Sequence, residues 1–200
     1  MALGKQAKTL TQKQIEVALS YVATTRHGLR NQVIFLLSCK AGLRAKEISS
    51  LTWSMVVDAS GHLGCTINLT NDASKGSKGG RVIPMNKELR ATLLQWFEQA
   101  KQRKRFDLHT DRVICTERAP ATSAQGVVNM FAGWYRDLGF VGCSSHSGRR
   151  SFITNAARKI STVGGSVRDV QIMAGHSNLN ITQRYIEFDS ESLKRVVDLV

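Results

Sequence analysis

The stretch AGHSNLNITQRY, residues 174–185, places Tyr185 nine residues after His176. Two upstream stretches carry a second histidine and further arginines: HSGRR at residues 146–150 and AGLRAKE at residues 41–47. Two arginines, two histidines and a tyrosine form a set that can attack a phosphodiester without a metal. These three stretches therefore decide both the fold and the chemistry expected of the chain.

Cleavage of a phosphodiester needs a nucleophile, neutralisation of charge and a proton for the leaving group. A tyrosine placed in line with the leaving oxygen gives a covalent phosphotyrosine. Each guanidinium holds phosphate oxygens through a planar, permanently charged fork. Histidine titrates near neutral pH, so it can accept or orient the phenol proton. Residues 71–80, with three glycines and two lysines, form an exposed hairpin turn whose lysine would protonate the departing hydroxyl.

The order and spacing of these stretches resemble the tyrosine recombinases, also called the phage integrase family. Residues 41–48 resemble the family's first arginine box, residues 146–149 its H-x-x-R box, residues 175–185 its closing box and residues 74–84 its lysine hairpin. The resemblance covers nearly the whole chain, from about Leu10 onward. It implies an α+β fold that is mostly helical: a tyrosine-recombinase catalytic domain with a small three-stranded antiparallel sheet.

The resemblance also implies catalytic roles. Arg44 and Arg149 would clamp the scissile phosphate and stabilise the pentacoordinate transition state. Tyr185 would be the nucleophile, which joins a DNA 3′-phosphate and releases a 5′-hydroxyl. His146 would be the base or orienting partner of the tyrosine, and His176 would donate a hydrogen bond to a phosphate oxygen.

Supporting roles follow from the same resemblance. Lys75 would be the general acid, although Lys78 competes for this role because the turn is one residue longer than is usual in the family. Glu47 lies one helical turn after Arg44 and would hold that guanidinium in place. Four basic side chains are expected to contact DNA: Lys78, Arg81, Arg150 and Arg184. The scheme needs no metal and no cofactor.

The chain departs from the family pattern in its H-x-x-R box and at its N-terminus. Gly148 and Arg150 stand where the family more often has a leucine and a histidine, and a glycine lowers local helix stability. The resemblance gives the N-terminal DNA-clamping domain that is usual in the family no counterpart within residues 1–200, so these residues are expected to form a single catalytic domain. A catalytic fragment and a naturally short member both fit this expectation.

The resemblance implies site-specific cleavage and rejoining of double-stranded DNA through a 3′-phosphotyrosyl intermediate, with no small-molecule substrate. Recombination joins two duplexes, so a homo-tetramer on DNA is expected, with the C-terminal segment passing to a neighbouring protomer. Two alternatives stay open: DNA relaxation by a type IB topoisomerase-like mechanism, and a non-catalytic DNA-binding regulator on the same fold. The target site and the choice among integration, excision, inversion and resolution stay open as well.

The composition agrees with a nucleic-acid partner. The 200 residues include 28 Lys and Arg against 15 Asp and Glu, which gives a formal net charge of +13 and a pI near 10.1. Such a protein most often meets a polyanion, although a solvated basic surface that serves solubility is the alternative. The four cysteines form no CxxC pair, so a zinc site is not expected. Without a signal peptide or a membrane-length apolar run, a cytoplasmic, nucleoid-associated protein with free thiols and no membrane partner is expected.

Hydrophobic periodicity and capping patterns predict the secondary structure. Helices are expected from Thr11 through Val22, around Val33–Leu37, over Arg44–Leu51, Lys87–Lys104, from a capping box at Thr122, and over His146–Lys159, Val167–Ala174, Leu179–Ile186 and Glu191–Val200. Strands are expected at Trp53–Val57, Cys65–Leu69 and Arg81–Pro84. The pattern thus predicts mostly helix around one small sheet.

Overall fold

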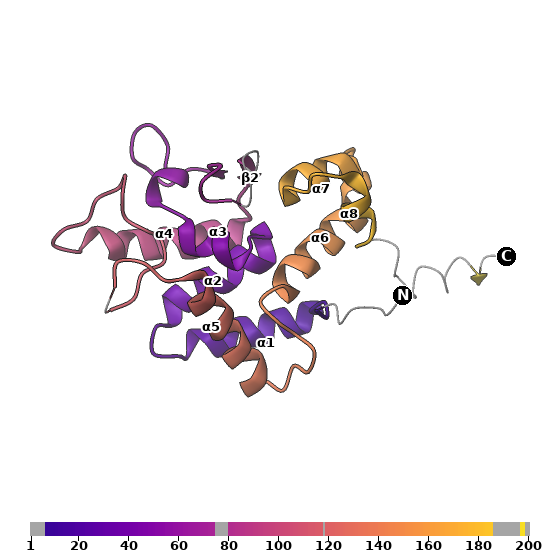
Figure 1. Cartoon of the computed structure of the whole chain (residues 1–200), viewed down its shortest axis with the longest axis horizontal. Helices are drawn as coiled ribbons and strands as arrows, with labels where there is room; N and C mark the ends of the chain where they lie inside the picture. Colours follow the sequence, from indigo (N-terminus) through magenta and orange to yellow (C-terminus); the bar gives the residue numbers. More distant parts are fainter. Residues whose placement is uncertain (1–6, 75–79, 118, 186–196, 199–200) are drawn as a thin grey trace. The chain divides into compact units, whose positions relative to one another are not determined.

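The computed structural model describes residues 7–74, 80–117, 119–185 and 197–198 (Figure 1). The chain divides into two compact units, Met1–Phe152 and Ile153–Val200. The division falls inside one helix, α6 (Ser147–Lys159), which therefore contributes residues to both units.

The first unit has a helical core built around α2. Its helical elements are α1 (Gln12–Ala23), α2 (Gly28–Ala41), α3 (Ala45–Ser50), the 3₁₀ turn η1 (Trp53–Met55), α4 (Lys87–Lys101), α5 (Ala124–Asp137) and the start of α6. Helix α2 packs against α1 and α4, and α3 packs against α5. The side chains of residues 33–37 in α2 are fully buried, because this run is apolar on every side. The predicted buried second helix is thus confirmed.

Side-chain caps determine where the helices begin. Thr11 accepts the backbone N–H of Gln14, whose side chain accepts the N–H of Thr11, and this is the predicted capping box. At α5 the prediction is wrong by one residue. Ser123 is the N-cap there and accepts the N–H of Gly126, whereas the side chain of Thr122 is buried.

The described residues contain a two-stranded antiparallel sheet rather than the three-stranded sheet expected. Strand β1 (Thr66–Leu69) pairs with β2 (Arg81–Pro84), and Ile67 lies opposite Ile83. Both isoleucines are fully buried, so one face of the sheet packs on the core.

Residues 53–57 are the predicted third strand, and this prediction is wrong. They begin with η1, and Val57 then makes an isolated bridge to Leu63. The Trp53 ring is fully buried against Phe97, with ring centroids 4.9 Å apart. A short apolar run indicates burial but does not distinguish a strand from a tight turn.

The second unit continues α6 and adds a pair of packed helices. Its elements after α6 are η2 (Ile160–Val163), α7 (Val167–Ala174) and α8 (Leu179–Gln183). Helices α7 and α8 pack against each other. Ser166 and Asp169 form a capping box at the start of α7, and Gly175 ends this helix in the left-handed conformation, with φ 62°.

Two helices end earlier than predicted, at Lys101 for α4 and at Gln183 for α8. The predicted helix over residues 191–200 lies outside the described residues except for residues 197–198. None of the described helices is both long enough and apolar enough to cross a membrane.

Candidate active site

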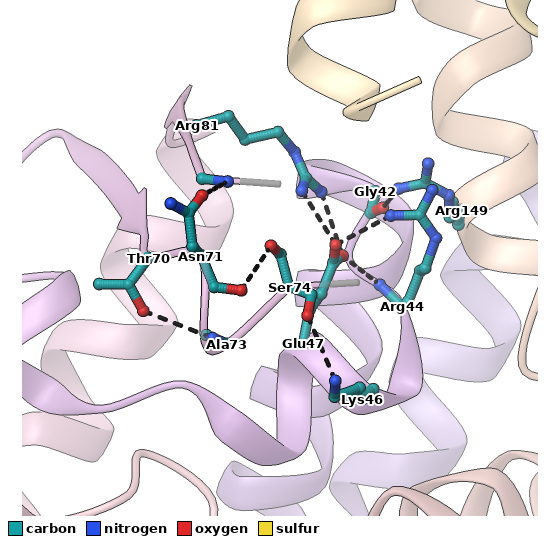
Figure 2. A network of polar contacts seen from close by, with 11 residues as sticks. Gly42, Arg44, Lys46, Glu47, Thr70, Asn71, Ala73, Ser74, Arg81 and Arg149 are labelled. Carbon is teal, nitrogen blue, oxygen red and sulfur yellow. Dashed lines mark hydrogen bonds and ion pairs between the residues drawn. The ribbon is translucent and has the colours of Figure 1, made fainter. Parts of the chain in front are cut away.

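Three charged side chains of the first unit form a buried ion-pair network (Figure 2). Nη1 of Arg44 donates to Oε1 of Glu47 at 2.9 Å. Arg81 donates to both carboxylate oxygens, from Nη1 to Oε1 at 2.9 Å and from Nη2 to Oε2 at 3.1 Å. The side chains of Glu47 and Arg81 are 1% and 4% exposed, whereas that of Arg44 is 27% exposed. The carboxylate thus fixes two guanidiniums, and Arg44 keeps the larger surface for a ligand.

The turn between α2 and α3 places Arg44 beside Glu47. Gly42 ends α2 with φ 67°, and a Cβ at this position would lie 2.5 Å from the ring of Phe152. Arg44 is the N-cap of α3, and its backbone N–H donates to Oε2 of Glu47 at 2.8 Å. The three-residue spacing in the sequence therefore predicts the contact that the structure shows.

Glu47 is held in its ionised form although it is buried. Burial by itself would raise the pKa of this carboxyl, because the charged form loses hydration. The hydrogen bonds and positive charge of Arg81, together with those of Arg44, outweigh this effect and lower the pKa below its ordinary value. The carboxylate is therefore a charged anchor for both arginines at neutral pH.

Arg149 lies in the first turn of α6 and reaches the same α2–α3 turn. Arg149 is 4% exposed, and its Nη1 donates to the carbonyl of Gly42 at 2.5 Å (Figure 2). The close approach of α6 to α2 requires Gly148, because a Cβ there would lie 2.5 Å from Oγ of Ser38. The glycine that departs from the family pattern thus has a packing role. Arg44 and Arg149 are both attached to one turn.

His146 lies three residues before Arg149 in the sequence, and Arg150 directly follows Arg149. His146 is exposed and lies immediately before α6, where its carbonyl accepts the backbone N–H of Arg150 at 2.9 Å. Nη1 of Arg150 donates to the carbonyl of Ala7 at 3.2 Å. Within the first unit, Arg81 from β2 and Arg149 from α6 therefore meet Arg44 and Glu47 around the α2–α3 turn, and His146 lies just before α6.

The two ends of the lysine hairpin are hydrogen-bonded to each other, and its first end is also hydrogen-bonded to α3. The two candidate lysines themselves lie outside the described residues: Lys75 and Lys78. Oδ1 of Asn71 accepts the backbone N–H of Gly80 at 2.8 Å, which closes the base of the hairpin. Nζ of Lys46 donates to the carbonyl of Ser74 at 3.3 Å (Figure 2). The base of the hairpin is thereby joined to the helix that carries Glu47.

The second unit brings His176 and Tyr185 together. Their rings stack with centroids 5.5 Å apart and planes 21° apart. Nδ1 of His176 lies 2.9 Å from Oγ1 of Thr182, whose carbonyl accepts the backbone N–H of Tyr185 at 3.0 Å. The carbonyl of Tyr185 accepts a longer hydrogen bond from the hydroxyl of Thr154, at 3.4 Å. Thr182 thus links the histidine to the tyrosine through both its side chain and its backbone.

The contact with Thr182 is compatible with either neutral tautomer of His176, because the hydroxyl can donate to Nδ1 or accept from it. When the hydroxyl of Thr182 donates to Nδ1, the neutral imidazole carries its proton on Nε2. That tautomer presents an N–H donor suited to a phosphate oxygen. Arg184, the remaining candidate of this unit, is exposed one residue before Tyr185.

Sequence comparison identifies the family. The profile of the Phage integrase family matches residues 8–192. The chain belongs to this family. Among its relatives is the tyrosine recombinase XerD of Neisseria meningitidis serogroup B, which is 29% identical over a match that covers 98% of this chain and 64% of the relative. The chain therefore spans a little less than two thirds of the length of this relative.

Solved structures share the fold of this phage integrase family member. The crystal structure of XerA recombinase gives a TM-score of 0.76 at 19% identity, covering 96% of this chain and 64% of that one. XerH site-specific recombinase bound to a palindromic difH substrate gives a TM-score of 0.73 at 19% identity, covering 94% and 51%. These matches confirm the predicted fold class, a mostly helical tyrosine-recombinase catalytic domain, apart from the number of strands.

Two features of this integrase-family site, the burial of Arg81 and the contact of Thr182 with His176, differ from or go beyond the sequence predictions. Arg81 was expected to contact DNA, but its side chain is buried against Glu47. The alternation of β2 carried a signal for this, because Arg81 and Ile83 point to the same, buried face. Thr182 carried no comparable signal, since an isolated threonine is most often a surface residue.

Proposed function

We propose that the chain is the catalytic domain of a site-specific tyrosine recombinase, which cleaves and rejoins double-stranded DNA through a 3′-phosphotyrosyl intermediate. The observation that carries the proposal is the attachment of Arg44 and Arg149 to one turn, with Arg44 braced by the buried Glu47. A guanidinium fixed before substrate binds needs little reorganisation to stabilise a charged transition state. The relative named XerD supports the activity, and the DNA complex of XerH supports DNA as the partner.

The two arginines neutralise the charge that builds up on the phosphate. Arg44 uses Nη1 for Glu47, and a guanidinium has five N–H donors, so further donors remain for the non-bridging oxygens. Arg149 approaches from the first turn of α6, a second element fixed to the same turn. Bidentate contact from two elements would set the orientation of the phosphate as well as its charge.

The nucleophile in this scheme is Tyr185. Its Oη attacks the phosphorus, the bond between phosphorus and the 5′-oxygen breaks, and the phenol proton passes to His146. The departing 5′-oxygen takes a proton from the hairpin lysine, Lys75 in our assignment, with Lys78 as the competing candidate. His176 donates from Nε2 to a non-bridging oxygen. The phosphotyrosine retains the energy of the broken bond, so rejoining requires neither a cofactor nor a metal.

Arg81 acts in this scheme as a positioning residue rather than as a DNA contact. Its guanidinium is committed to both oxygens of Glu47 and has little exposed surface. Arg81 is the first residue of β2 and comes directly after the lysine hairpin. It therefore connects the hairpin to Glu47, the carboxylate that also holds Arg44. Three other basic side chains remain our candidates for contact with the DNA backbone: Lys78, Arg150 and Arg184.

The assembly follows from the proposed reaction. Strand exchange between two duplexes needs four active sites, so we propose a homo-tetramer on DNA. The C-terminal segment that would join the protomers lies largely outside the described residues. We also propose that residues 1–200 act as one catalytic domain, with its two compact units serving one reaction, on cytoplasmic, nucleoid-associated DNA.

Covalent trapping tests the proposed function. The full chain is incubated in EDTA with supercoiled plasmid and with DNA that flanks its own gene, and is then denatured to detect protein attached to DNA. Wild type is expected to give an adduct at a 3′-phosphate, and Tyr185→Phe is expected to bind DNA without giving one. Tyr21→Phe is the matched control, because Tyr21 lies on α1 with its hydroxyl bonded to Asp137 at 2.7 Å.

Each other result has a definite meaning. Tight DNA binding without an adduct in wild type would favour a DNA-binding regulator on this fold. An adduct that survives Tyr185→Phe would show that another group is the nucleophile. Adduct formation that needs a divalent metal would contradict the side-chain-only scheme.

A further inference from the structure

A pocket of about 530 Å³ lies in the first unit at the far end of α2 from Gly42. It is lined by the start of α2, the side of α4 near its C-terminus and the loop that follows α4. Its lining includes four arginines and one indole: Arg30, Arg103, Arg105, Arg112 and Trp96. The volume falls in the range of pockets that hold small organic ligands.

The pocket is separate from the proposed active site. His27 and Arg30 line it at the first turn of α2, whereas Gly42, which accepts from Arg149, ends that helix. Helix α2 has 14 residues, so the two ends are about 20 Å apart at 1.5 Å per residue. A ligand in the pocket therefore cannot be the phosphate held by Arg44.

The lining favours an anion. Its four arginines outnumber its two carboxylates, Asp111 and Glu117, which leaves two formal positive charges in excess. Both carboxylates are already engaged: Glu117 pairs with Arg26 at 2.8 Å, and Asp111 accepts the backbone N–H of Asp107 at 3.2 Å. Among the described residues, none of the four lining arginines forms a salt bridge with a carboxylate, so the excess positive charge is not paired within the pocket.

The aromatic part of the lining is held in a fixed orientation. Nε1 of Trp96 donates to the carbonyl of Val113 at 2.7 Å. The guanidinium of Arg103 stacks over the Trp96 ring, 5.2 Å from its centroid. Nucleobases stack on aromatic rings and on arginine planes alike. The pocket thus combines a planar stacking surface with cations.

We propose that this pocket binds the phosphate of a nucleotide, with Arg103 and Arg105 at the phosphate and the stack of Arg103 on Trp96 beside the base. The proposal gives a role to the basic run of residues 101–105, which the proposed active site does not use. It does not rest on the proposed cleavage activity. The nucleotide is either free in solution or part of a nucleic-acid strand, since the recognised chemistry is the same.

Fluorescence anisotropy with methylanthraniloyl-ATP as the probe tests the pocket. The full chain carrying Tyr185→Phe is titrated at about 100 mM salt, so that no covalent step interferes. We expect saturable one-to-one binding that Arg103→Ala with Arg105→Ala weakens at least tenfold. The matched control is Lys13→Ala with Arg136→Ala, which removes the same charge from exposed positions on α1 and α5 and should change the Kd less than twofold.

The competing outcomes are distinct. Binding that does not saturate, or equal weakening by both double variants, would overturn the proposal in favour of diffuse attraction to a basic surface. Arg105→Ala alone keeps the test decisive if the double variant fails to fold, because Arg105 is exposed. Competition then identifies the source: displacement by unlabelled ATP alone indicates a free nucleotide, and stronger displacement by a 20-base-pair duplex or a single strand indicates nucleic acid.

Discussion

Among the single residues, Glu47 connects Arg44, which we propose contacts the phosphate, to the buried Arg81. Arg44 and Arg81 approach its carboxylate from different elements, and its side chain is 1% exposed. Removing one partner of a buried ion pair costs about 3–5 kcal/mol, because the remaining charges lose their compensation. We therefore expect Glu47→Gln to lower the free energy of unfolding by about that amount at pH 7, measured by urea denaturation. A loss below about 1 kcal/mol would show that the network is not a stabilising one.

The lowered pKa of Glu47 predicts that the free energy of unfolding depends on pH. Its pKa is lowered in the folded protein, against an ordinary value of about 4.3 in the unfolded chain. The unfolded state therefore binds the proton more readily, so the stabilisation is complete above the unfolded pKa and is lost as pH falls through the folded pKa. The stability gap between wild type and Glu47→Gln should be constant from pH 6 to 8 and should narrow below pH 5. A gap that widens on acidification would contradict the lowered pKa.

Arg81 permits a test of positioning as distinct from stability. Arg81→Lys keeps the charge but loses the two-point contact with Glu47. We expect the rate of adduct formation to fall about tenfold, equivalent to about 1.4 kcal/mol, with DNA affinity within twofold of wild type. Arg90→Lys is the control, because Arg90 also makes two hydrogen bonds, to the carbonyls of Gly64 and Leu63. It should lower stability without lowering the rate, and equal rate loss in both variants would refute the positioning role.

Helices and strands were predicted correctly where the residues that determine them are close together in the sequence. The capping box at Thr11 and the apolar run of α2 are local signals, and both helices form where they were expected. The segment at Trp53 is shaped by packing against Phe97, a partner distant in the sequence, and the strand predicted there does not form. The site behaves in the same way, because Glu47 lies one turn from Arg44 whereas Arg81 comes from another element. The three-residue spacing predicted the pairing of Arg44 with Glu47, whereas the alternation of β2 indicates that Arg81 is buried but not that its partner is Glu47.

The packing of α6 on α2 can be tested through Gly148. A Cβ there would lie 2.5 Å from Oγ and 3.0 Å from Cβ of Ser38, so the Ser38 side chain or one of the two helices would have to shift. We expect Gly148→Ala to destabilise the protein by about 1–3 kcal/mol in thermal or urea unfolding. Gly133→Ala is the matched control in α5, where the nearest atom is a side-chain nitrogen of Arg136 at 4.0 Å. It should stabilise by about 0.5–1 kcal/mol, and similar changes in both variants would mean that the close approach is not required.

Across the whole molecule, the residues proposed for cleavage are divided between the two compact units. Arg44 and Arg149 belong to the first, and His176 and Tyr185 to the second. The reaction we propose needs both sets at one phosphate. Neither unit would therefore retain the activity by itself, even though each carries a preorganised pair of side chains.

The formal charge of +13 predicts that the affinity of the whole molecule for DNA depends on salt concentration. Binding to duplex DNA releases condensed counterions, so log K should fall linearly with log salt, with a slope of about −0.9 for each phosphate contacted. Anisotropy with a labelled duplex and the non-cleaving Tyr185→Phe chain measures this slope without covalent trapping. Arg184→Gln, at an exposed position beside Tyr185, should reduce the slope by about one, whereas Lys13→Gln on α1 should leave it unchanged. An affinity that is independent of salt would contradict backbone contact as the main source of binding, and equal slope changes in both variants would show that Arg184 is not a specific contact.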